Sequence, residues 1–145
     1  MATRSTIAVE LKSGKVMQVY CHSDGYLEGV GSTLESHYDT TALAKKLVSL
    51  GSISSLHPLV KPTGPHSFDK PQHCVTVAYA RDRGEKLAVS KFKDVADYKA
   101  NYRGEEYDYL FTVNQEWLVR CDGTNDKWVN LLNAAVLEEE ARESN

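Results

Sequence analysis

The sequence predicts an α+β fold, in which an antiparallel or mixed sheet built from hairpins carries three to four helices packed mainly on one face. Three observations support this prediction. Near each end of the chain, two short segments alternate apolar and polar residues on either side of a turn, as hairpin strands do. Other segments place apolar residues at helical spacing. The chain has 145 residues, which is the length of a single domain (1–145).

The first hairpin is expected to pair residues 5–10 with residues 16–21. Ile7 and Val9 alternate with polar or small residues, so one face of the first strand is apolar. The second strand shows the same alternation. Between them Gly14 supplies the positive φ that a tight turn often needs.

Two helices are expected next. Ser32 and Glu35 fit a capping box, which predicts a short helix over residues 32–38. A second helix should run from residue 40 or 41 to residue 50, because leucines recur there at helical spacing. Gly51 is well placed as its C-terminal cap.

All four prolines fall within residues 58–71, which predicts a long and stiff loop. Residues 74–80 then show the clearest strand pattern in the chain, and residues 94–102 show a helical one.

The last third is expected to begin with a hairpin of residues 107–113 and 117–121, turning at Asn114–Gln115. Trp128 and Val129 are expected to add a short edge strand, and residues 130–142 a helix. Its acidic end, 138–145, is expected to be frayed, because the helix dipole disfavours acids at that end.

The composition is that of an ordinary soluble protein, with 41% hydrophobic and 26% charged residues. No stretch approaches the length of a membrane span, and no secretory signal is recognised at the start, so the expected location is the cytoplasm. The three cysteines are expected to be reduced thiols near strand ends.

The formal net charge of −3 is unevenly distributed. Residues 1–56 are neutral, residues 57–103 carry +4, and residues 104–145 carry −7. The basic middle and the acidic end are expected either to pair with each other or to be solvated; the alternative is that the middle forms a basic ligand-binding surface. Direct nucleic-acid binding is not expected, because the basic excess is small.

Two kinds of chemistry are weak alternatives. Cys21–His22 and His73–Cys74 could approach a zinc ion, but adjacent strand residues point to opposite faces, so no metal or other cofactor is predicted. His22 and Asp24 could perform acid–base chemistry in a small hydrolase. No catalytic residue is assigned, because Asp24 also suits a turn.

Ligand binding is the favoured interpretation. Arg81 and Arg83, after the strand at 74–80, offer planar groups for phosphate. The glycine-rich loop 22–31 allows a ligand to approach its backbone. The predicted ligand-binding residues share these two segments and are His22, Asp24, Tyr26, Arg81 and Arg83.

Three stretches carry a family resemblance: ATRSTIAVE at residues 2–10, VYCHSDGYLE at residues 19–28 and YARDRGE at residues 79–85. They resemble a family of small uncharacterised bacteriophage and prophage proteins, over the chain to about residue 120. The resemblance implies an accessory protein that counters a host defence system in the bacterial cytoplasm. It implies no catalytic residue.

The resulting expectation is a phage-type protein that sequesters a small phosphate-bearing, nucleotide-like signal, as a possible homo-oligomer and without turnover. Arg81 and Arg83 would hold phosphate and Tyr26 would stack on the ligand. The alternative is an inhibitor of a host defence complex, such as a CRISPR effector. That alternative places three acidic residues at the interface: Glu105, Glu106 and Asp108.

Overall fold

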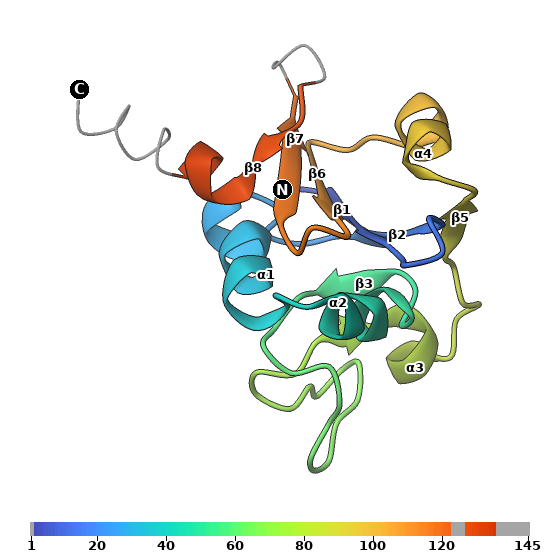
Figure 1. Ribbon diagram of the computed structural model, residues 1–145. Coiled ribbons are helices and arrows are strands. Elements are labelled where there is room, and N and C mark those ends of the chain that lie inside the picture. Colours follow the sequence, from blue (N-terminus) through green and yellow to red (C-terminus); the bar gives the residue numbers. More distant parts are fainter. Residues whose placement is uncertain (1, 123–126, 136–145) are drawn as a thin grey trace, which may run out of the picture.

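A single open mixed sheet organises the protein. The computed structural model in Figure 1 describes residues 2–122 and 127–135. Within them, eight strands form the sheet in the order β4-β3-β2-β1-β6-β7-β8, with β5 also beside β2. The strands are β1 (Ser5–Glu10), β2 (Val16–Cys21), β3 (Ile53–Ser55), β4 (Val77–Ala78), β5 (Ser90–Phe92), β6 (Tyr107–Phe111), β7 (Trp117–Cys121) and β8 (Val129–Asn130). The α+β prediction is therefore confirmed.

Helices occupy both faces of this sheet. The helical elements are η1 (Leu27–Gly31, a π-helix), α1 (Ser32–His37), α2 (Thr41–Val48), α3 (Tyr79–Arg83) and α4 (Val95–Asn101), and a helical stretch begins at Leu131. In Figure 1, α1 and α2 lie on the opposite side of the sheet from α4. We call the side of α1 and α2 the near face and the side of α4 the far face.

The main core lies on the near face. Alternate residues of the strands meet η1, α1 and α2 there, and the largest side chains are fully buried; they include Ile7, Val19, Leu34, Tyr38, Leu47, Tyr109, Phe111 and Trp117. Two hydrogen bonds anchor this layer. The Tyr109 hydroxyl donates to the Gly25 carbonyl at 2.7 Å, and the Trp117 indole N–H donates to the Tyr38 carbonyl at 2.9 Å.

A smaller core lies on the far face. The buried ring of Tyr98 in α4 packs over Ala8, Val16 and Leu110. The ring of Phe92 in β5 meets Tyr98 edge-on at 5.3 Å. Because α4 covers only one end of this face, the remainder is available to polar residues and loops.

Both predicted hairpins are confirmed. The strands β1 and β2 have the predicted bounds, and β6 and β7 pair antiparallel through a turn in which Gln115 has a φ of 63°. The predicted edge strand is also present as β8. The sequence did not indicate β3 and β5, because each has three residues and is defined by its pairing with β2.

Two local predictions are wrong. The strand predicted over residues 74–80 is reduced to β4, because the Asp82 carboxylate accepts the Ala78 N–H at 2.8 Å and starts α3 there. Ser32 is not a helix cap, because the chain enters α1 from η1 already in helical conformation. The cap predicted at Gly51 is confirmed, with a φ of 79°.

The predicted helix over 130–142 begins at residue 131, and its part from 136, with the acidic tail 138–145, lies outside the described residues. None of the helices in the described part of the chain has the length and apolar character needed to cross a membrane.

Tyr109→Phe should destabilise the fold by about 1–3 kcal/mol, because the buried Gly25 carbonyl loses its donor. Urea unfolding measures this loss. The matched control is Tyr26→Phe, which removes an exposed hydroxyl and should change stability by less than about 0.5 kcal/mol. Equal effects of the two changes would contradict the proposed role of the Tyr109 hydroxyl.

Candidate functional site

The loop after β2 holds the first three predicted binding residues. The His22 ring nitrogen Nδ1 lies 2.8 Å from the Tyr20 hydroxyl, and Tyr26 donates to the Asp24 carboxylate at 3.2 Å. Asp24 has a φ of 55° and Tyr26 is 40% exposed. Among the described residues, His22 and Asp24 therefore have separate partners rather than each other, which is not the arrangement of an acid–base pair.

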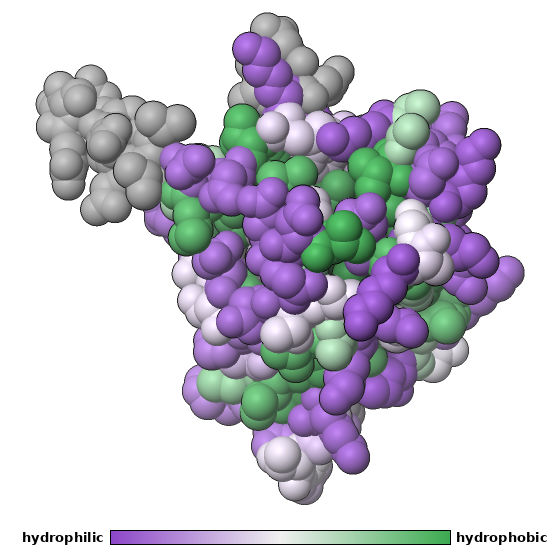
Figure 2. Space-filling view, in the orientation of Figure 1, coloured by the Kyte–Doolittle hydropathy of each residue, from purple (hydrophilic) through white to green (hydrophobic). Residues whose placement is uncertain are grey.

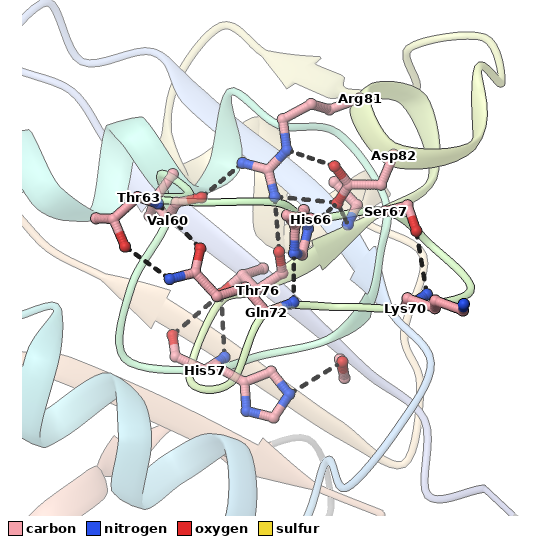
Figure 3. Close-up of polar contacts among 12 residues, drawn as sticks. His57, Val60, Thr63, His66, Ser67, Lys70, Gln72, Thr76, Arg81 and Asp82 are labelled. Carbon is pink, nitrogen blue, oxygen red and sulfur yellow. Dashed lines mark hydrogen bonds and ion pairs between the residues drawn. The ribbon is translucent and has the colours of Figure 1, made fainter.

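Arg81 holds the proline-rich loop. As Figure 3 shows, its guanidinium donates to the Val60 carbonyl at 2.5 Å and to the Thr76 carbonyl at 2.7 Å. It also pairs with Asp82 at 2.8 Å. A phosphate bound at Arg81 would have to compete with these three partners.

Asp82 is the centre of the same network. It accepts hydrogen bonds from Arg81, from the Ala78 N–H and from His66 Nε2 at 3.0 Å. Burial opposes its ionised form, but these donors outweigh burial and lower its pKa to about 2. His66 Nδ1 accepts the Gln72 N–H at 2.9 Å, so the ring proton is on Nε2 and points at Asp82.

Arg83 also has partners within the chain. It pairs with Glu85, and its guanidinium lies 4.3 Å from the centre of the Phe68 ring and 4.9 Å from that of Tyr79. The structure places Arg81 and Arg83 on the same helix, α3. Among the described residues, neither arginine forms a hydrogen bond or ion pair with Asp24 or Tyr26, which are bonded to each other. In the described part of the chain, every ion pair joins two residues of the same third of the sequence, so the basic middle does not neutralise the acidic end there.

A polar row, buried except at Tyr20, crosses the far face, and sequence reasoning missed it. Tyr20, Thr6, Asp108 and Arg120 are neighbours on four adjacent strands, in the order β2, β1, β6 and β7. Asp108 is fully buried and Arg120 is 6% exposed. One signal could have found this pair, because the predicted second hairpin places Asp108 directly opposite Arg120.

Asp108 is satisfied by several donors. Arg120 donates to it twice, at 2.6 and 2.9 Å, and the Thr6 hydroxyl donates at 2.6 Å. Burial raises the pKa of the Asp108 carboxyl, although these donors oppose the rise. Burial disfavours the charge on Arg120, but Asp108 outweighs burial and raises the pKa of the guanidinium.

Residues 103–106, which we call the strap, cross over this polar row. The Arg103 carbonyl accepts from the Gln18 amide at 3.4 Å, and the Glu105 carbonyl accepts from Arg120 at 2.6 Å. The Glu105 N–H donates to Asp108 at 3.0 Å. The strap therefore divides the far face into two grooves.

The first, the Tyr20 groove, has a volume of about 650 Å³. Its floor is the sheet, at Thr6, Gln18 and Tyr20, and its walls are residues 86–90 and the strap. Lys86 and Arg103 line it, and neither side chain has an ion pair within the described residues.

The second, the Trp128 groove, has a volume of about 610 Å³ and lies beside α4. Its lining combines two aromatic rings with charged side chains and includes Lys99, Tyr102, Glu105, Glu106, Arg120, Asp122 and Trp128.

No group of three or more metal-ligating side chains is found among the described residues. Cys21 is buried, and burial raises its pKa to about 12, so the thiol is protonated near neutral pH and is a poor nucleophile. Cys74 is a free thiol as well.

Comparison with protein-family models, with curated proteins and with solved structures found no match to this chain. The resemblance to phage proteins therefore remains a prediction.

Asp82→Asn should lower the free energy of unfolding by about 2 kcal/mol at pH 7. This is the free energy that corresponds to lowering the pKa of Asp82 from 3.8 to about 2 on folding. Because the pKa is lowered on folding, this contribution is present above pH 3.8 and is lost as the pH falls toward 2. Urea unfolding should show a smaller difference in the free energy of unfolding between wild type and variant at pH 3 than at pH 7. A difference that is equal at both pH values would contradict this role.

Arg120→Met should destabilise by about 3–5 kcal/mol, because it leaves Asp108 as a buried charge without its cation. Arg83→Met is the control, since its ion pair is exposed and should contribute at most about 1 kcal/mol. Similar losses in urea unfolding for both variants would refute the special position of Arg120.

Proposed function

We propose that this protein binds a small phosphate-bearing, nucleotide-like molecule in the Tyr20 groove and holds it without turnover. One observation carries the proposal. The groove places two cations without an ion pair in the described residues, Lys86 and Arg103, beside the Tyr20 ring and over a polar floor.

The cations supply the affinity for phosphate. Lys86 and Arg103 are exposed and line the same groove. A bound phosphate between them would gain charge-assisted hydrogen bonds without breaking an ion pair of the protein. Arg81 and Arg83, in contrast, would have to release partners first.

Three of the remaining lining groups suit the rest of such a molecule, whereas Glu105 adds one carboxylate to the same lining. The half-buried Tyr20 ring offers an apolar surface for a base, and its hydroxyl is held by His22. Ser52 and Ser90 add hydroxyl groups for a sugar. A volume of about 650 Å³ lies in the usual range of small-molecule sites.

The resemblance to phage proteins gives this binding a purpose, which is to withhold a nucleotide signal from a host defence system. The two alternatives have weaker support. A hydrolase would need His22 and Asp24 to cooperate, and each has another partner. An inhibitor using Asp108 at its interface is excluded for that residue, because Asp108 is fully buried.

Thermal unfolding with cyclic mono- and dinucleotides, each in large excess, should reveal at least one that raises Tm by about 5 °C or more, because a ligand of the folded state stabilises it. Lys86→Ala with Arg103→Ala should abolish the shift. Arg81→Ala with Arg83→Ala should lower Tm without nucleotide and leave the ligand-induced shift in place.

If the ligand-induced shift persists in Lys86→Ala with Arg103→Ala and is lost in Arg81→Ala with Arg83→Ala, the phosphate site is on α3 and not in the Tyr20 groove. The absence of any shift in Tm with the whole panel would refute the proposed function. Mass spectrometry of the nucleotide recovered from denatured protein separates binding from hydrolysis. An intact molecule supports sequestration, and a cleaved one supports the hydrolase.

A further inference from the structure

The Trp128 groove contains a rigid aromatic corner. The rings of Tyr102 and Trp128 stand at 61° to each other, with their centres 5.7 Å apart. Both rest on the buried ring of Tyr98, whose centre is 5.0 Å from that of Tyr102 and 5.9 Å from that of Trp128. Because Tyr98 is fully buried, the corner is supported from behind.

A cation of the protein itself lies over this corner. The Lys99 ammonium is 5.9 Å from the centre of the Trp128 ring, at the outer limit of a cation–π interaction. Lys99 is exposed and is held there by no ion pair in the described residues. The ring face is therefore a place that attracts positive charge and whose present occupant is easily displaced.

The charges around the corner favour a cation from outside. Three carboxylates, of Glu105, Glu106 and Asp122, line the groove. Among the described residues, the other lining cation is Arg120, which pairs with buried Asp108 and, at 3.2 Å, with Asp122. Glu105 and Glu106 have no ion pair there and are the carboxylates that a cation from outside would meet. Asp122 is 65% exposed, and Glu106 is exposed as well, so the acidic groups extend from the groove onto the surface.

The geometry points to a docking site for an arginine side chain of a basic segment in a partner protein. A guanidinium is planar, stacks flat on aromatic rings and forms paired hydrogen bonds with carboxylates. An ammonium is attracted to a ring only as a point charge and cannot form the paired bonds. The exposed carboxylates at the rim match the further basic residues of such a segment. This site lies on the opposite side of the strap from the Tyr20 groove and does not depend on the proposed nucleotide.

The two tryptophans allow a direct test by nuclear magnetic resonance of their indole N–H groups. Titration with a triarginine peptide should shift the Trp128 signal. The Trp117 signal should stay in place, because this side chain is 2% exposed and donates to Tyr38. A trilysine peptide should bind at least about three-fold more weakly.

Variants make the test specific. Glu106→Gln should weaken triarginine binding about three- to ten-fold, and Asp69→Asn, a control on the proline-rich loop, should leave it unchanged. Lys99→Ala should strengthen binding about two- to five-fold, because it removes the internal competitor. A role of Lys99 in stability alone would not produce tighter binding.

Three results would overturn the inference. The first is an unshifted Trp128 signal. The second is equal binding of triarginine and trilysine with no effect of Glu106→Gln, which is unspecific attraction. The third is a free arginine amide that binds as tightly as triarginine, which indicates a small-molecule site instead of a protein-docking site.

Discussion

The buried pair of Asp108 and Arg120 constrains the whole far face. A charge pair removed from water is tolerated only where further hydrogen bonds complete it. Here Thr6 of β1, Arg120 of β7 and the Glu105 N–H of the strap supply those bonds to one carboxylate. The strap, and not a helix, therefore covers this part of the sheet. Its position creates a groove on each side. Both proposed binding sites thus follow from the need to satisfy one ionised side chain.

The parts of the fold that the sequence predicts are those in which a local pattern and the tertiary environment agree. Ile7 and Val9 alternate with polar residues and bury the same face that the pattern indicates. Asp108 and Arg120 also fit the alternation, but the pattern predicts that they lie on an exposed face. They are buried because residues 103–106 cover them, and no pattern in these four residues indicates that they do so. Short strands such as β3 and β5 have no pattern of their own and exist through their pairing with β2.

The candidate site shows the same division. The glycines of loop 22–31 and the charge of Arg81 indicate a binding role, but partners far along the chain decide what each side chain can do. Arg81 donates a hydrogen bond to the carbonyl of Val60, which lies 21 positions earlier in the chain. Lys86 and Arg103 belong to no recognisable motif in the sequence, yet they line one groove. Charge counted along the chain consequently says less about ligand binding than the ion pairs that each charge forms.

The parallel pairing of β1 with β6 imposes an order on synthesis and folding. Thr6 lies beside Asp108, so the strand at the centre of the sheet acquires its second neighbour only after more than a hundred further residues have been made. Until then the N-terminal hairpin leaves the ribosome with an unpaired inner edge, which is the kind of edge that recruits strands of other chains. Contacts of such long range also slow folding. The nascent chain therefore passes through a period of exposure to aggregation that ends when β6 closes the centre of the sheet.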